Sequence, residues 1–157
     1  MSVKRFLLAT VLLALGSGAT VTADDGITDI VLQVYKTPTC GCCGKWVDHL
    51  VENGFTVDVE TVNSTREIQD KAGVPREMRS CHTAIAGDYF IEGHVPADVI
   101  EQLFAEQPED VRGIAVPGMP MGSPGMESPN PEVYDIIAVG DDGSFSRYAT
   151  RQGKAPE

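Results

Sequence analysis

Basic residues are scarce in this chain of 157 residues. It has 12 lysines and arginines against 23 aspartates and glutamates, and its formal net charge at pH 7 is −11. Nucleic acids and anionic membrane surfaces attract proteins through clustered positive charge. The charge balance therefore argues against nucleic acid and anionic membranes as partners, and it suits a cationic ligand.

The chain also lacks a hydrophobic run long enough to cross a membrane. The apolar stretch from Phe6 to Leu15 is much shorter than the roughly 20 residues that a membrane-spanning helix needs. Lys4 and Arg5 precede this stretch, and small residues lead up to Ala23. The pattern predicts a secretory signal peptide over residues 1–23, which is cleaved to leave a chain with no membrane anchor; an uncleaved anchor is the alternative.

Cysteine is equally sparse, and its spacing excludes an ordinary disulfide framework. Three of the four cysteines, Cys40, Cys42 and Cys43, lie within four residues, and the fourth is Cys81. Neighbouring residues such as Cys42 and Cys43 have poor geometry for a mutual disulfide. Two structural disulfides, the usual use of four cysteines in an exported chain, are therefore not expected.

Hydrophobic periodicity predicts an α/β domain. Strands are expected over residues 30–35 and 55–59 and in two hairpins, 83–86 with 89–91 and 136–139 with 145–148; helices are expected over residues 45–53 and 64–73 and from residue 96. The order β-α-β-α-β-β-α is that of the thioredoxin/glutaredoxin fold, and Cys40 and Cys43 form a C-x-x-C pair where that fold has its active site. We therefore predict one thioredoxin/glutaredoxin-like metal-binding domain over residues 24–157, which ends in a C-terminal β-hairpin.

A segment rich in glycine, proline and methionine precedes the C-terminal hairpin. Residues 113–131 contain too many glycines and prolines for a helix or a central strand, so we predict a loop there. Thioethers on a loop can hold Cu(I), although packing over the core explains each methionine as well. The methionines of this loop are Met119, Met121 and Met126.

The cysteine spacing favours copper over zinc and over iron–sulfur clusters. In the thioredoxin order, the loop that carries Cys81 lies beside the C-x-x-C turn, so all four sulfurs should converge. Thiolates are soft ligands that select Cu(I), zinc or iron–sulfur centres. Structural zinc usually takes its cysteines as two separate C-x-x-C pairs, and the spacing matches no iron–sulfur pattern.

Charge favours several Cu(I) ions over one. Four thiolates carry a charge of −4, and a single Cu(I) would leave −3 in a partly buried place, which is costly. Several ions bridged by sulfur would nearly cancel that charge, and the adjacent pair Cys42 and Cys43 suits bridging. The alternative is a dithiol oxidoreductase in which Cys42 and Cys81 are spectators. In either case Cys40, which leads the helix, is expected to be the most exposed and reactive thiol.

Histidines are secondary candidates for the metal site. His82 follows Cys81 directly and is a candidate ligand, whereas His94 precedes a helix start and is more typical of a turn or capping residue. His49 is expected on the exposed face of the first helix.

Taken together, these motifs resemble the CopG-type copper-resistance proteins. The segments that carry the resemblance are Cys40 to Trp46, Ser80 to Thr83, Glu92 to Pro96 and Ala115 to Pro120, and the resemblance covers residues 30–150. It implies a thioredoxin-like protein of the Gram-negative periplasm, encoded beside copper-export and copper-oxidation genes. It also implies Cu(I) bound by the four cysteines and a suspected redox role.

The sequence therefore predicts a periplasmic Cu(I)-binding protein for copper resistance, with a multinuclear copper–thiolate site. Its partners would be copper ions and other periplasmic copper-export or copper-oxidation proteins. A thiol–disulfide oxidoreductase and a copper metallochaperone are the alternatives.

Overall fold

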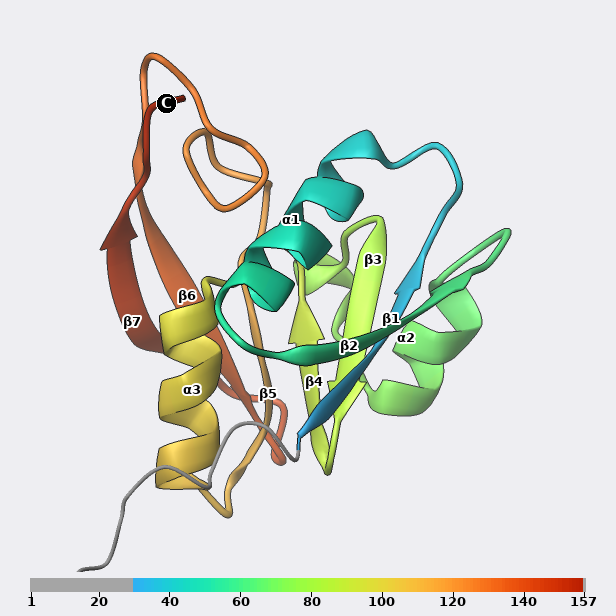
Figure 1. Cartoon of the computed structure of the whole chain (residues 1–157). Coiled ribbons are helices and arrows are strands. Elements are labelled where there is room, and N and C mark those ends of the chain that lie inside the picture. Colours follow the sequence, from blue (N-terminus) through green and yellow to red (C-terminus); the bar gives the residue numbers. More distant parts are fainter. Residues whose placement is uncertain (1–29, 157) are drawn as a thin grey trace, which may run out of the picture.

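One seven-stranded mixed sheet organises the chain in this computed structural model, which describes residues 30–156 (Figure 1). The elements are, in chain order, β1 (Val31–Lys36), α1 (Gly41–Glu52), β2 (Thr56–Thr61), α2 (Arg66–Ala72), the 3-10 helix η1 (Arg76–Met78), β3 (His82–Ala86), β4 (Tyr89–Glu92), α3 (Ala97–Glu106), β5 (Val111–Ala115), β6 (Val133–Gly140) and β7 (Phe145–Gln152). The strand order is β2-β1-β3-β4-β5-β6-β7.

The predicted α/β class and the order β-α-β-α-β-β-α are confirmed from β1 to α3. The assignment to the thioredoxin/glutaredoxin class stays a prediction. The predicted signal peptide, residues 1–23, lies outside the described residues. Among residues 30–156, no helix is both long and apolar enough to cross a membrane.

Helices cover both faces of the sheet (Figure 1). Helices α1 and α3 lie on one face, and α2 lies on the other. Successive side chains of a strand point to opposite faces, so Ile91 of β4 joins the first core and Phe90 joins the second. The first core includes Leu32, Val34, Trp46, Leu50, Ile100, Leu103 and Ile136, and the second comprises Val74, Met78, Phe90, Ala115 and Val139. Burial on both faces explains why apolar residues can occupy successive positions of an inner strand, as Phe90 and Ile91 do in β4.

Helix α1 begins at Gly41, four residues earlier than the sequence predicted. Cys40 is its N-cap residue, and the Cys40 N–H donates to the Thr37 carbonyl at 3.3 Å, which closes the turn after β1. Cys43, Trp46 and Leu50 are the buried residues of the helix. Their burial outweighs the poor helix propensity of the glycines, because tertiary packing contributes more to a short helix than propensity does. Cys42 and Cys43 therefore lie in the first helical turn rather than in a loop.

The loop was predicted to begin at residue 113, which is too early, because Gly113 to Ala115 belong to β5. Strand β5 pairs in parallel with β4 and antiparallel with β6, so it is a central strand. Glycine is required at this position, since a Cβ on Gly113 would lie 2.5 Å from Cγ of Phe90 and would also meet the Phe90 carbonyl oxygen. The C-terminal hairpin, β6 with β7, is confirmed and is longer than predicted.

The close approach of Phe90 to Gly113 gives a test of this packing. We expect Gly113→Ala to lower the free energy of unfolding by about 1–3 kcal/mol, because an added methyl group must displace a buried ring or the backbone of β4. Urea denaturation measures the change. Gly44→Ala is the matched control: open space surrounds Gly44 in α1, so alanine should be neutral or slightly stabilising. Equal stability of Gly113→Ala and the parent would contradict the packing.

Candidate metal centre

Strand pairing brings the distal cysteine to the C-x-x-C turn. Strand β1 pairs antiparallel with β3, and Lys36 at the end of β1 lies opposite His82 at the start of β3. The Thr37 N–H donates to the Cys81 carbonyl at 3.4 Å, which extends the pairing by one step beyond the strands. Cys81 therefore lies beside the turn that leads into Cys40, as the sequence predicted.

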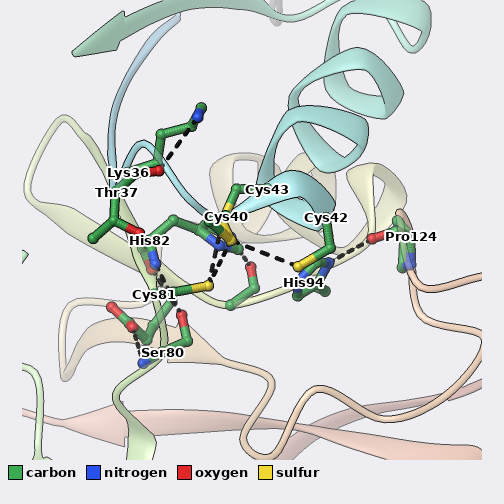
Figure 2. Close-up of a disulfide and its surroundings, with 12 residues drawn as sticks. Lys36, Thr37, Cys40, Cys42, Cys43, Ser80, Cys81, His82, His94 and Pro124 are labelled. Atoms are coloured by element: carbon green, nitrogen blue, oxygen red, sulfur yellow. Dashed lines mark hydrogen bonds between the residues drawn. A yellow bond between two sulfur atoms is a disulfide. The ribbon is translucent and has the colours of Figure 1, made fainter. Parts of the chain in front are cut away.

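The sulfur atoms form one compact group (Figure 2). Cys40 and Cys43 are joined in a disulfide. The Sγ atom of Cys81 lies 2.7 Å from Sγ of Cys40 and 3.3 Å from Sγ of Cys43. The Sγ atom of Cys42 lies 3.6 Å from that of Cys40. All four predicted sulfur ligands are thus brought together, with Cys40 at the centre.

Cys40 is not the most exposed thiol of the group, and that prediction is wrong. Its residue is only 8 % exposed and Cys43 is fully buried, whereas the free cysteines Cys42 and Cys81 are half-buried. The physical reason is that the Cys40 sulfur touches the sulfurs of all three other cysteines. Burial raises the pKa of the Cys81 thiol, and the nearby Cys42 raises it further.

His82 lies directly against the sulfurs. A ring nitrogen of His82 and the Sγ atoms of Cys40, Cys43 and Cys81 all lie within 4.8 Å of one another. The ring is fully buried, its centroid lies 4.5 Å from that of Trp46, and its Nε2 lies 2.9 Å from the Gly93 carbonyl oxygen. Burial, with a contribution from the neighbouring His94, lowers the pKa of His82 to about 3, so the ring is neutral at pH 7.

His94 is a buried neighbour of His82 rather than a capping residue. The ring centroids of the two histidines are 5.1 Å apart in an edge-to-face arrangement. The His94 side chain is fully buried, its Nδ1 lies 2.7 Å from the Pro124 carbonyl oxygen (Figure 2), and burial lowers its pKa. The capping role falls to His49, whose Nε2 accepts from the Ala97 N–H at the start of α3 at 3.1 Å.

Glu92 is a buried carboxylate that sequence analysis missed. Its Oε1 accepts from the Ser80 N–H at 2.5 Å and from Nε2 of Gln69 at 2.9 Å, and its Oε2 lies 2.5 Å from Oγ1 of Thr83. Ser80 directly precedes Cys81 and Thr83 lies two residues after it, so Glu92 anchors the chain on both sides of the distal cysteine. Burial raises the pKa of Glu92. The sequence feature that could have indicated a buried carboxylate is the position of Glu92 at the end of an otherwise largely apolar strand, β4.

The Pro/Gly/Met loop packs against the first turns of α1 through Gly125. A Cβ on Gly125 would lie 2.8 Å from the Cys42 carbonyl oxygen and 2.9 Å from the Trp46 nitrogen. The predicted thioether ligands are less enclosed than the cysteines: Met119 is 40 % and Met121 is 47 % exposed, and Met126 is half-buried.

Comparison with known proteins decides the family. Two solved structures, described as copper resistance protein CopG in forms 1 and 2, are each 38 % identical to this chain with a TM-score of 0.73. They cover 79 % and 78 % of this chain and 98 % of their own chains. The chain belongs to the CopG family of copper resistance proteins. A family profile described as a protein of unknown function, DUF411, matches residues 78–126 of this CopG-family chain. A comparison of the chain with curated protein sequences found no match.

In this CopG-family chain, the group that could hold a metal ion comprises Cys40, Cys43, Cys81 and His82. Soft sulfur donors beside a neutral imidazole suit copper and zinc alike, and the family favours a copper-related function. The profile match includes Cys81, both buried histidines and Glu92.

The buried neutral histidines predict a stability that depends on pH. The pKa of His82 is about 3 in the folded chain and 6.5 in the unfolded chain, so its contribution is complete above pH 6.5 and is lost as the pH falls toward 3. From pH 7 to pH 5 we expect the free energy of unfolding of the metal-free disulfide form to fall by about 2 kcal/mol on account of His82. Urea denaturation at the two pH values measures this change.

His82→Gln is the matched variant for the pH test, because a glutamine amide can still donate to the Gly93 carbonyl but does not titrate. Its loss of stability between pH 7 and pH 5 should be smaller than that of the parent. Glu92 acts in the opposite direction, since burial raises its pKa and it favours the folded state more as the pH falls. The same pH dependence in the parent and in His82→Gln would show that His82 is not the source of the loss of stability.

Proposed function

We propose that this chain is a periplasmic Cu(I)-binding protein for copper resistance, whose reduced cysteines hold several Cu(I) ions. The observation that carries the proposal is the convergence of four sulfurs, with Cys81 2.7 Å from Cys40 and Cys42 3.6 Å from Cys40. Thiolates this close together can bridge neighbouring metal ions, and thiolates are soft ligands that select Cu(I). Copper is the cargo of this site.

Charge balance supports a multinuclear site. Reduction of the Cys40–Cys43 disulfide would give four thiolates in a place where two of the four residues are buried. The described residues nearest the sulfurs include neutral His82, which supplies no counter-charge. Several Cu(I) ions would neutralise the thiolates, whereas a single ion would leave a net negative charge that burial makes costly.

A thiol–disulfide oxidoreductase is the second candidate, because a specific observation favours it. The Cys40–Cys43 disulfide lies at the start of α1, and the free thiol of Cys81 touches both of its sulfurs. A thiolate that attacks a disulfide sulfur passes through a mixed disulfide, which is the reaction of such enzymes.

The half-exposed Cys42 and Cys81 would also suit a metallochaperone, which must pass its metal to a partner protein.

Anaerobic copper loading tests the proposal. We expect the fully reduced protein, titrated with Cu(I) against a competing Cu(I) chelator, to bind more than one copper per chain, because four thiolates need more than one monovalent ion for charge balance. Metal analysis after gel filtration gives the count. A plateau at one copper would refute the multinuclear site, and equal preference for zinc would refute the copper assignment.

Matched variants separate the candidates. Cys81→Ser and Cys42→Ser should each lower the copper count, whereas both should still form the Cys40–Cys43 disulfide. Replacement of Met119, Met121 and Met126 by leucine is nearly volume-conserving and should weaken copper retention less than either serine variant does. If both serine variants load copper like the parent, the oxidoreductase becomes the better function.

Export is the part of the proposal that rests on residues 1–23. We expect the protein recovered from a periplasmic extract to begin at Asp24, because the charged start, short apolar run and small residues form a signal-peptide pattern. Intact-mass measurement of the recovered protein tests this. A mass that includes residues 1–23 would count against export with cleavage.

A further inference from the structure

A polar cavity lies between helix α2 and the segment of chain that leads to Cys81. Its volume is about 450 Å³, which falls within the range of small-molecule sites. Three of the residues that line it are arginines, Arg66, Arg76 and Arg79. Asp70 is the one acidic residue among the described residues that line it, and the others all carry hydroxyl or amide groups.

The cavity gathers positive charge in a chain whose formal net charge is −11. Asp70 is already paired with Arg79, at 2.7 Å, whereas within residues 30–156 neither Arg66 nor Arg76 forms an ion pair. A glutamate follows each of these two arginines directly in the chain, but no glutamate of the described chain lines the cavity. Three arginines against one aspartate therefore leave the cavity a charge of about +2, which the chain itself does not neutralise.

Arg79 is held in a fixed orientation at this cavity. Its side chain is only 21 % exposed, whereas Arg66 and Arg76 are exposed. Nε and Nη2 of Arg79 donate to the Val74 carbonyl at 3.0 and 2.9 Å, and Nη2 also donates to Asp70. These bonds leave the two N–H groups of Nη1 without a partner within residues 30–156. A guanidinium that is oriented before a ligand arrives loses little conformational freedom on binding.

Thr65 gives a second, independent indication of a ligand. The residue lines the cavity and is only 6 % exposed, yet its hydroxyl does not cap helix α2 and forms no hydrogen bond within residues 30–156. Its oxygen is not one of the fully enclosed atoms, so a molecule in the cavity can reach it. Side chains as enclosed as this one usually bond to the protein, and this hydroxyl is instead left to the contents of the cavity.

We propose that this cavity, the arginine pocket (Thr65, Arg66, Arg76 and Arg79), binds a small molecule that carries about two negative charges as carboxylate or phosphate groups. The planar fork of a guanidinium matches the oxygens of both groups, and the Thr65 hydroxyl can donate a further hydrogen bond to them. The inference does not depend on copper, because none of the predicted metal ligands is among the described residues that line the pocket.

The arginine pocket adjoins the distal cysteine. Ser80 lines the pocket and directly precedes Cys81 in the chain. Gln69, another lining residue, donates to the Ser80 carbonyl at 3.0 Å. A bound anion therefore lies next to the segment that presents the distal thiol. In a chain whose net charge repels anions, the pocket gives an anionic molecule a place beside Cys81.

Titration of the mature, metal-free protein with succinate and with inorganic phosphate tests the inference. About 0.15 M sodium chloride in the buffer screens charges that lie more than about 8 Å apart, which suppresses general attraction between ions and protein. Calorimetry measures the affinity, and the amide shifts in NMR spectra locate the site. We expect saturable binding at a single site, with shifts centred on residues 64–66 and 76–80. Binding of succinate alone would identify carboxylates as the ligand groups, and binding of phosphate alone would identify phosphates.

Matched variants test the assigned residues. Arg66→Gln and Arg76→Gln each remove one guanidinium that has no ion pair, and each should lower the affinity about tenfold, because a charge-assisted hydrogen bond is lost. Thr65→Val keeps the size of the side chain and should lower the affinity several-fold. Arg147→Gln is the control with the same change of charge, because Arg147 is an exposed residue of β7 that forms no ion pair within residues 30–156 and does not line the pocket. It should bind like the parent.

Three outcomes would overturn the inference: no saturable binding of either anion, amide shifts centred on another part of the chain, or an equal loss of affinity in Arg147→Gln and the pocket variants. The amide shifts of the parent decide the case even if a variant does not fold. The titration uses no copper, so its outcome is separate from that of the proposed function.

Discussion

The antiparallel pairing of β1 with β3 is the constraint on which the site depends. It places Lys36 opposite His82 and lets Thr37 bond to the Cys81 carbonyl, so a cysteine far away in the chain meets the turn after β1. A shift of the register by one residue would turn each of these side chains to the other face of the sheet and would separate the distal cysteine from the turn. The close packing of the sulfurs is therefore a consequence of backbone hydrogen bonds, which hold the site together without copper.

Buried polar groups around the sulfurs fall into two kinds. Glu92 is fully satisfied, because Gln69, Ser80 and Thr83 all bond to its carboxylate, and it holds the backbone before Cys81 and the Thr83 side chain after it. The two histidines are half satisfied, with one nitrogen bonded to a carbonyl and the other left free. A satisfied network rigidifies a structure, whereas a free lone pair in the interior is available to a ligand. Glu92 therefore positions the site, and His82 is the histidine that lies within the group of sulfurs.

Several features could be predicted from local patterns and several could not. The alternation of elements up to α3 and the hairpin of β6 and β7 were predictable, since each follows from hydrophobic periodicity over a few residues. Strand β5 was missed because glycine is typical of loops, and the reason for Gly113 in a strand is the Phe90 ring that packs against it. The start of α1 was misplaced because Gly41 and Gly44 have low helix propensity, which the burial of Cys43 and Trp46 overrides. The glutamate of the site was missed because its partners come from three separate segments.

The sequence by itself determined the chemistry of this protein: four soft sulfur donors, three of them within four residues, in an acidic chain whose motifs match the CopG family. It also determined that Cys81 should approach the C-x-x-C turn, because the order of elements implies that neighbour. Tertiary structure alone decided which thiols are accessible, since exposure depends on what surrounds a side chain: Cys40 is buried among the other sulfurs, and Cys42 and Cys81 are half-exposed. It alone placed His94 beside His82, because 5.1 Å between their rings reflects how β3, β4 and the loop at Pro124 pack, and no local pattern encodes that distance.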